Sequence, residues 1–461
     1  MLKGSKKATF KRCIAMALSL MLVVSVLAGC GSKKEESSGE STSNGGKVIN
    51  IYSWNETVKE TYEATYGKTH PDVKVNWVIT PTEGNAYQNK LDQDLPNQDK
   101  AKADDKIDIF CLEADYILKY VDTEYTLDLQ KDLGLTDEDL SEQYEYTKEV
   151  ATDSKGALKG TSYEANPGVF VYRRSIAKDV LGTDDPDEVQ KALEDWTKFG
   201  DVAEQASAKG YKMLSGYDDS FRTFGNNVKA PWVNENDEIV VDDAIDEWID
   251  QTKDFTDKGY NNKTQLWSTE WSADQGPAGK VFGFFYSTWG VQFTLLGNAL
   301  ETPVEEGGKL EVGNGLFGDY AICYGPADYY WGGTWLAAAK GTDNAEEVAD
   351  IFREMTTDGE TMKTITQTFD KFTNNKKAME EYADSGITSA FLGGQNHIKM
   401  FLDVAPNVSM ENVSPYDQGM NEALQQAFKD YYDGKVSKDE AYDNFFDAVI
   451  EKYPNLSRAD G

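Results

Sequence analysis

Hydrophobic positions between residues 48 and 112 recur with two periods that alternate along the chain. One stretch places an apolar residue at every second position, at Val73, Val75, Trp77 and Ile79. This spacing is typical of a strand with one buried face. The short apolar runs 48–52 and 107–112 also fit strands, and the stretches 58–66 and 87–95 repeat at helical spacing. Strand, helix, strand, helix, strand in this order predicts a mainly parallel sheet covered by helices.

A second unit is predicted further along the chain. Residues 116–160 are polar, and we expect them to be helical. The Pro-Gly pair at 167–168 then opens a β-rich run that ends at Arg174, which indicates a crossover into the second unit. Two further buried strands are predicted within 279–289 and 320–324.

The stretch 329–340 lies between a predicted strand of the second unit and a helix. Three aromatic residues stand beside Gly332 and Gly333, and the chain then becomes small and apolar. Because glycine allows positive φ and close backbone approach, we interpret this stretch as a bend beside an aromatic surface. Asp343 or Asn344 can cap the helix that follows. We therefore predict that Gly332-Gly333 crosses between two lobes, next to a binding cleft.

The C-terminal region is predicted to be helical. One apolar face recurs at helical spacing, at Met420, Leu424, Phe428 and Tyr431. Ser437 and Glu440 have the spacing of a capping box, in which each residue satisfies a free N–H of the first helical turn. A second helix is therefore expected to begin at Ser437.

The N-terminus has the pattern of a secretory signal peptide. Residues 1–12 carry five basic groups and no acid, and residues 13–28 are almost wholly apolar. The run Leu27-Ala28-Gly29-Cys30 resembles a bacterial lipobox, which implies cleavage before Cys30 and attachment of lipid to its sulfur. A polar Gly/Ser segment, 30–46, follows and is expected to act as a flexible tether. The alternative is an uncleaved anchor with an incidental cysteine.

Charge excludes one class of partner. The 461 residues carry a formal net charge of −34, and loss of the basic signal segment makes it more negative. A nucleic acid would be repelled by such a body. The acidity otherwise fits a solvated surface. The 25 Tyr, 20 Phe and 10 Trp supply core material and leave some aromatic rings for binding surfaces.

Cysteine use is sparse. Cys13 lies in the signal segment and Cys30 is the predicted lipid site. Cys111 and Cys323 each lie in an apolar run, in different predicted lobes. We predict that these two residues are buried free thiols and form no disulfide.

Several local patterns resemble one family when their order is considered. Ile107-Asp108-Ile109-Phe110 is similar to that family's "PDIF" strand, and Gly160–Val180 to its "G-x-x-Y-x-x-P" segment, although Arg173 replaces the usual Asn. The segments 279–289 and 332–355, and Glu440-Ala441 near the end, match further motifs in the family's order. The family is the extracellular solute-binding lipoproteins of bacterial ABC importers, in the sugar-binding branch of the maltose-binding protein family. The resemblance covers about 47–455.

This resemblance implies a periplasmic-binding-protein-like fold of type II, with two α/β lobes, a hinge and a ligand cleft between them. The first lobe is expected to be 47–163 plus 333–370, and the second 164–332 plus 371–461. Both lobes are then discontinuous. The cleft closes over the ligand by bending at the hinge.

A sugar cleft needs aromatic rings beside hydrogen-bonding groups. Rings stack on the C–H faces of a sugar, whereas carboxylates and amides bind its hydroxyls. The ends of the predicted strands and the crossings supply this mixture. The predicted ligand-binding residues are Trp54, Glu56, Glu113, Asp115, Trp271, Trp289, Tyr330 and Trp331.

Structural alternatives exist for several of these residues. Trp271 and Trp289 are equally compatible with core positions, and Glu56 and Asp115 with helix N-terminal acids that offset the dipole. Two other tryptophans, Trp77 and Trp248, lie in regular periodic patterns and are assigned to the core. Tyr217-Asp218-Asp219 is predicted to be an exposed turn, with a loop at the cleft as the alternative.

The predicted function is capture of a mono- or oligosaccharide for an ABC importer, on the extracytoplasmic face of the membrane. The expected partners are the carbohydrate, the permease subunits and the membrane through the lipid on Cys30; the protein is expected to be a monomer with no cofactor and no metal site. Alternatives are a carrier of a polyamine, ferric ion or peptide, a surface glycosidase, and an adhesion module. His70 and His397 show no metal-ligand spacing, and no nucleotide or nucleophile motif is present.

Overall fold

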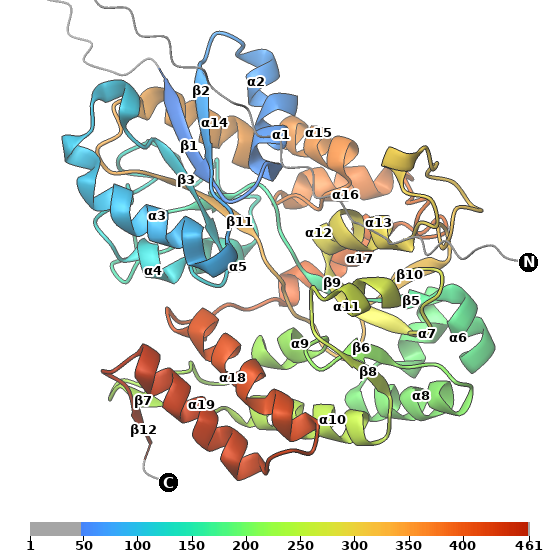
Figure 1. Cartoon of the computed structure of the whole chain (residues 1–461). Helices are drawn as coiled ribbons and strands as arrows, with labels where there is room; N and C mark the ends of the chain where they lie inside the picture. Colours follow the sequence, from blue (N-terminus) through green and yellow to red (C-terminus); the bar gives the residue numbers. More distant parts are fainter. Residues whose placement is uncertain (1–47, 460–461) are drawn as a thin grey trace, which may run out of the picture. The chain divides into compact units, whose positions relative to one another are not determined.

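The computed structural model describes residues 48–459. The predicted signal peptide, tether and lipid site at Cys30 lie outside the described residues. Within 48–459, no helix is both long enough and apolar enough to span a membrane. The predicted strands and helices of the first 65 or so described residues are confirmed, because their apolar spacing matches the elements that form (Figure 1).

The first sheet has five strands in the order β2-β1-β3-β11-β4. These strands are β1 (Ile49–Ser53), β2 (Val75–Ile79), β3 (Ile109–Glu113), β4 (Thr161–Ser162) and β11 (Thr334–Ala338). β1 is parallel to both β2 and β3, whereas β11 is antiparallel to β3 and to β4. The predicted parallel βαβαβ unit is therefore confirmed, and a strand from far along the chain extends it.

Helices lie against this first sheet. They are α1 (Thr57–Ala64), α2 (Tyr66–Thr69), α3 (Ala86–Asp94), α4 (Leu118–Val121), α5 (Glu145–Glu149), α14 (Ala345–Thr356) and α15 (Gly359–Phe369). Residues 116–160 contain only the short helices α4 and α5, so the prediction of a helical segment there is wrong. Local side-chain bonds explain the turns: Thr136 N donates to Asp139, and Ala157 N donates to Asp153. Such Asp and Thr contacts compete with helical backbone bonds.

The second main sheet has three antiparallel strands in the order β10-β5-β9. These are β5 (Gly168–Arg173), β9 (Gly283–Ser287) and β10 (Tyr320–Cys323), so the predicted strands are confirmed. Two small parallel sheets pair β6 (Leu214–Gly216) with β8 (Asn261–Thr264), and β7 (Glu238–Ile239) with β12 (Ser457–Arg458). The remaining helices are α6 (Arg174–Leu181), α7 (Pro186–Ala192), α8 (Trp196–Ala208), α9 (Phe221–Gly225), α10 (Asp243–Asp257), α11 (Thr269–Asp274), α12 (Thr288–Gly290), α13 (Leu296–Ala299), α16 (Lys376–Asp384), α17 (His397–Val404), α18 (Asp417–Tyr432) and α19 (Lys438–Lys452).

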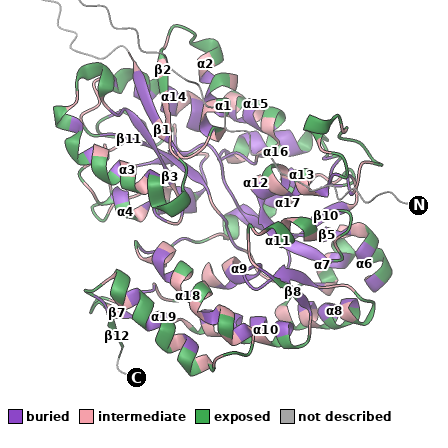
Figure 2. Ribbon diagram, in the orientation of Figure 1, coloured by how far each residue is buried: buried purple, intermediate pink, exposed green. Residues whose placement is uncertain are grey.

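Burial follows the sheets, as Figure 2 shows for the central strands. Cys111 in β3 and Cys323 in β10 are both buried and free, which confirms the prediction for these two thiols. A separate core joins α10, α18 and α19 around the fully buried Trp248. Trp77 is only partly buried and packs edge-on against Tyr62, so its assignment to the core holds in part.

The predicted caps have different outcomes. Ser437 accepts a hydrogen bond from the backbone N–H of Glu440, so the cap of α19 is confirmed. At α14, Asn344 is the N-cap residue but its side chain caps no N–H. Its amide donates instead to the buried carboxylate of Asp108, at 3.0 Å. That carboxylate also accepts from the backbone N–H of Asn50 and from the hydroxyl of Thr342. Together these bonds offset the cost of burying it.

Three chain segments run between the two main sheets and bond to one another. Ala165 N donates to Phe372 O, and Trp331 N donates to Asn166 O, each at 3.1 Å. Gly332 (φ +73°) and Gly333 (φ +133°) connect the strand β10 of one sheet to β11 of the other. We propose that the two sheets are the centres of the two predicted lobes, with the boundaries given above, and that these three segments form the hinge.

Candidate ligand-binding site

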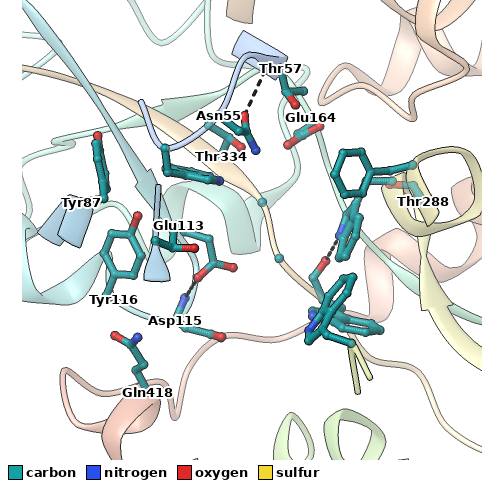
Figure 3. A pocket seen from close by; sticks show the side chains of 18 of the residues that line it. Asn55, Thr57, Tyr87, Glu113, Asp115, Tyr116, Glu164, Thr288, Thr334 and Gln418 are labelled. Carbon is teal, nitrogen blue, oxygen red and sulfur yellow. Dashed lines mark hydrogen bonds between the residues drawn. The ribbon is translucent and has the colours of Figure 1, made fainter. Parts of the chain in front are cut away.

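A cavity of about 900 Å³ is lined by the end of β3, by the start of β11, by the residues that follow β9 and by loops and helices from distant parts of the described chain. Its size is at the upper end of small-molecule sites. Its lining includes Trp54, Asn55, Glu56, Tyr87, Glu113, Asp115, Tyr116, Glu164, Arg222, Trp267, Thr288, Trp289, Phe293, Trp331, Gly332, Lys371, Gln418 and Glu422. Figure 3 shows Tyr87, Tyr116 and Glu113 on one side of it and Thr288 on the other.

The wall on the first-sheet side is built at the carboxyl ends of β1 and β3. Both strands are parallel, so both ends meet at one edge of the sheet, where ligands of α/β folds bind. Trp54 follows β1 and its ring lies 5.7 Å from that of Tyr87, edge to face. The side chain of Asn55 accepts from Thr57 N at 3.0 Å, which fixes the turn into α1. This wall is therefore held in shape by the residues next to it.

The opposite wall is aromatic. Trp289 Nε1 donates to the carbonyl oxygen of Trp331 at 2.7 Å, and Ser287 Oγ donates to the same oxygen at 2.8 Å. The two indoles meet edge to face at 5.3 Å, and the ring of Trp267 is stacked 6.1 Å from Trp289. Trp267 has a positive φ of 68° and is 56% exposed. An exposed indole on such a backbone is expected at binding sites.

Charged groups meet at the end of β3. Arg222 of α9 forms a bidentate pair with Asp115, at 2.9 and 2.7 Å, and its guanidinium lies 5.5 Å from the ring centre of Trp331. Burial alone would raise the pKa of Asp115, but the charge and hydrogen bonds of Arg222 outweigh burial and lower it. Burial, followed by the charge of Asp115, raises the pKa of Glu113 to about 8. Glu113 therefore takes up a proton at a higher pH than an ordinary carboxyl group does.

A second ion pair lies in the proposed hinge. Lys371 Nζ is 3.3 Å from both Glu164 Oε2 and the hydroxyl of Tyr163. Next to it, His397 Nε2 lies 2.8 Å from Asp370 Oδ1. These contacts connect the segments that cross between the sheets to the cavity lining.

Of the predicted residues, the structure places six at this cavity: Trp54, Glu56, Glu113, Asp115, Trp289 and Trp331. Trp271 does not line it: this residue is 1% exposed and donates its indole N–H to Asp219 at 3.1 Å. Tyr330 faces a separate small pocket beside Asp417. The rings of both residues pack inside the protein. The sequence pattern does not show whether an aromatic ring is packed in this way or exposed in a cleft.

The segment Tyr217-Asp218-Asp219 is buried, so the prediction of an exposed turn is wrong. Asp219 accepts from the backbone N–H groups of Ser215 and Gly216, at 2.7 and 3.0 Å, which makes burial of its carboxylate possible. Asp218 and Asp219 line a side cavity of about 410 Å³, which shares Arg222, Trp267, Trp331, Glu422 and Gln425 with the main cavity.

Sequence reasoning missed several lining residues. Arg222, Trp267 and Lys371 come from a short helix and two loops whose positions depend on packing between distant segments. The sequence gives a local indication of a binding residue at Arg222, because it is a lone charged residue between two aromatic residues, Phe221 and Phe224. Across residues 48–459, no group of three or more His, Cys, Asp or Glu residues is arranged to hold a metal ion.

The family model described as "Bacterial extracellular solute-binding protein" matches residues 61–435 of the chain. No curated protein sequence matches this chain.

Solved structures resemble the chain over most of its length. An extracellular solute-binding protein of family 1 has a TM-score of 0.73 at 20% identity, over 88% of this chain and 99% of that one. An ABC-transporter-associated binding protein from B. animalis subsp. lactis, in complex with β-1,6-galactobiose, has a TM-score of 0.66 at 18% identity, over 90% and 100%. The galacto-N-biose/lacto-N-biose I-binding protein from Bifidobacterium longum, in complex with lacto-N-biose, scores 0.64 at 15% identity, over 90% and 99%. These likenesses confirm the predicted type II fold.

Proposed function

Because the chain belongs to the family of bacterial extracellular solute-binding proteins, we propose that it captures a mono- or oligosaccharide for an ABC importer. The observation that carries this proposal is the lining of the main cavity. Indole rings line it on both walls, and carboxyl, amide and hydroxyl groups stand among them.

This lining suits the two kinds of surface that a sugar has. The C–H face of a pyranose ring stacks on Trp289 or Trp331, whose positions are fixed by hydrogen bonds to one carbonyl oxygen. Hydroxyl groups both donate and accept, so they can bind the carboxyl group of Glu113 and the amides of Asn55 and Gln418. Two of the similar structures hold disaccharides, which is in keeping with this proposal.

Binding is proposed to close the lobes. The cavity is lined by the end of β3, by the start of β11 and by Thr288 and Trp289, which follow β9 of the second main sheet. Three bonded segments connect the two main sheets. A ligand that contacts both walls gains its full set of contacts only when the lobes are close, so it favours the closed form. The permease of an importer can then recognise the loaded form.

A thermal-shift screen tests the proposed ligand class. The purified protein is mixed with neutral mono- and oligosaccharides, including β-1,6-galactobiose and lacto-N-biose, and separately with spermidine, ferric ion and short peptides. At least one neutral sugar is expected to raise the melting temperature by several degrees, because a ligand that binds only the folded state stabilises it. Stabilisation by spermidine, iron or peptide alone would refute the sugar class.

We propose a binding role without catalysis. A glycosidase needs two carboxyl groups that are free to act on the sugar. At the end of β3, Asp115 is instead held by both terminal nitrogens of Arg222, and Glu164 in the same lining is paired with Lys371. No reducing ends should be released from the stabilising oligosaccharide on long incubation. Sustained release would make the protein an enzyme.

We propose further that lipid on Cys30 holds the protein at the outer face of the membrane. The support is the apolar run 13–28, the residues Leu27-Ala28-Gly29 before the cysteine and the polar tether after it. Replacing the cysteine, Cys30→Ser, is expected to move the protein from the membrane fraction to the medium. If the variant stays membrane-bound, the lipid-anchor proposal is wrong.

A further inference from the structure

Resting on the proposed sugar-binding function, we propose that the cavity takes uncharged sugars and rejects sugars that bear a carboxylate, sulfate or phosphate. Asp115 and Glu164 set this selectivity, because each neutralises one of the two basic side chains in the cavity lining. The two acids would then act as specificity-determining residues through the cations that they hold.

Charge in the lining is unbalanced. Among the described residues that line the main cavity, seven are acidic: Glu56, Glu60, Glu113, Asp115, Glu164, Asp370 and Glu422. The basic residues in the same lining are Arg222 and Lys371. An anionic ligand entering this cavity therefore meets mostly carboxyl groups, and its binding depends on the availability of these two cations.

Arg222 is already paired. Both terminal nitrogens of its guanidinium donate to Asp115, one to each carboxylate oxygen, in the geometry that a ligand carboxylate would need. Its side chain is 22% exposed and that of Asp115 26%, so the pair is partly buried. The pair uses two of the five N–H donors of an arginine. The remaining donors are available for sugar hydroxyls, whereas the charge is cancelled.

Lys371 is held in a similar way. Its ammonium lies 3.3 Å from Glu164 Oε2 and 4.9 Å from the ring centre of Tyr163. The two charged side chains are only 12% and 7% exposed. Separating such a buried pair to bind a ligand anion would leave Glu164 as an uncompensated buried charge, which is strongly unfavourable.

An acidic sugar loses the water around its charged group when it enters the cavity, and no unpaired cation in the lining compensates for this loss. Its negative charge is also repelled by the carboxylates of the lining. Like-charge juxtaposition in an interface is a recognised means of rejecting wrong partners. An uncharged sugar meets neither cost. Its hydroxyls can accept from Arg222 and donate to the carboxylates.

Titration calorimetry with three variants tests this inference. The probes are β-1,6-galactobiose, any other neutral disaccharide found in the screen, and digalacturonic acid. The wild-type protein is expected to bind a neutral probe at least about 100-fold more tightly than digalacturonic acid. Asp115→Asn keeps the shape of the side chain but releases the charge of Arg222, so it should bind digalacturonic acid at least about tenfold more tightly than the wild type does.

Two further variants distinguish the effect of freeing a cation for the ligand from the effect of removing one negative charge. Glu60→Gln removes one negative charge from the same lining, at an exposed position with no ion pair among the described residues, and should change digalacturonate binding less than threefold. Glu164→Gln releases Lys371 and provides a second gain-of-binding test if Asp115→Asn does not fold. Equal gains in Asp115→Asn and Glu60→Gln would overturn the inference, because the effect would then be one of general charge.

Two wild-type outcomes have different meanings. If wild-type protein binds digalacturonic acid as tightly as the neutral disaccharides, the charge selectivity is wrong and the sugar-binding function stands. If no sugar of either kind binds, the proposed function itself fails and the inference fails with it.

Discussion

At the scale of single residues, the aromatic wall depends on one carbonyl oxygen. The carbonyl of Trp331 accepts from Ser287 and from the indole of Trp289, so it sets the orientation of a ring that lines the cavity. A ring whose rotamer is fixed before binding loses little entropy when a ligand stacks on it. Both the fixed position and the size of the Trp289 ring are therefore expected to contribute to ligand affinity.

Replacing this ring tests its role. Trp289→Ala is expected to weaken binding of the best neutral sugar by tenfold or more, about 1.4 kcal/mol or above, since stacking area and its hydrogen bond are both lost. Titration calorimetry gives the affinity. Trp77→Phe, at a partly buried position outside the cavity lining, is the control and should leave affinity unchanged. An unchanged affinity in Trp289→Ala would show that the sugar does not stack there.

A buried carboxyl group makes stability depend on pH. Burial, with a further contribution from Asp219, raises the pKa of Asp218 to about 7. Between its ordinary pKa near 4 and about 7 the folded state then holds a proton that the unfolded state has lost. The contribution of this group to stability is complete below about pH 4 and is lost as the pH rises to about 7.

Asp218→Asn removes this dependence. The free energy of unfolding of the variant, minus that of the wild type, should rise by about 2–4 kcal/mol between pH 4 and 7, since each pKa unit is worth about 1.4 kcal/mol. Chemical denaturation at several pH values measures this difference. Asp201→Asn, at an exposed position on α8, is the matched control. A difference that stays level across this range would contradict the burial of an acid with a raised pKa.

Some of the cavity residues could be predicted from their places at the ends of predicted strands, and others could not. Trp54 and Glu113 could be predicted because parallel strands place their carboxyl ends at one edge. Arg222 could not, since its pairing with Asp115 depends on how α9 docks against residues about a hundred positions away. Trp271 was predicted for the cavity, but its indole is used by a buried carboxylate that local sequence does not show.

At the scale of elements, the segment of the proposed hinge that connects β10 to β11 depends on two glycines. Gly333 has φ of +133°, and a Cβ there would lie 2.7 Å from the ring of Trp335. Gly332 has φ of +73°, and a Cβ there would lie 2.9 Å from the indole nitrogen of Trp289. The link from β10 to β11 therefore needs glycine both for its dihedral angles and for its close contacts.

Gly333→Ala tests this requirement. We expect a loss of about 2–5 kcal/mol in stability, from backbone strain together with the clash against Trp335. Gly386→Ala is the matched control, because Gly386 has φ of +79° but no atom within 4 Å of its Cβ position. The control should lose only about 1–2 kcal/mol. Equal losses measured by thermal denaturation would mean that the contact with Trp335 can relax.

Element prediction succeeded where one period dominates. β2 and α3 follow a strict apolar spacing and form as expected. In 116–160 the buried residues Leu129, Leu133 and Leu140 follow no single period, and Asp and Thr side chains bond to nearby backbone groups. Such a segment is shaped by packing and local polar contacts, which a periodicity argument does not include.

At the scale of the whole described chain, side chains assigned to the two proposed lobes bond to each other directly. Asp115, after β3, is bonded to Arg222 of α9, and Gln88 of α3 donates to Gln418 of α18 at 2.9 Å. Each of these pairs joins residues assigned to different lobes. A sugar that contacts Trp289 and Glu113 together would add to this set of contacts and favour closure.

The central claim is that an uncharged sugar binds between the two sheets, stacked on the aromatic wall. The most direct test is a crystal structure of the protein with the neutral sugar that gives the largest thermal stabilisation. A pyranose ring is predicted to lie against Trp289 or Trp331, with hydroxyls bonded to Glu113 or Arg222 and with Asp115 still paired to Arg222. A sugar bound outside this cavity, or one whose binding separates Asp115 from Arg222, would contradict that claim.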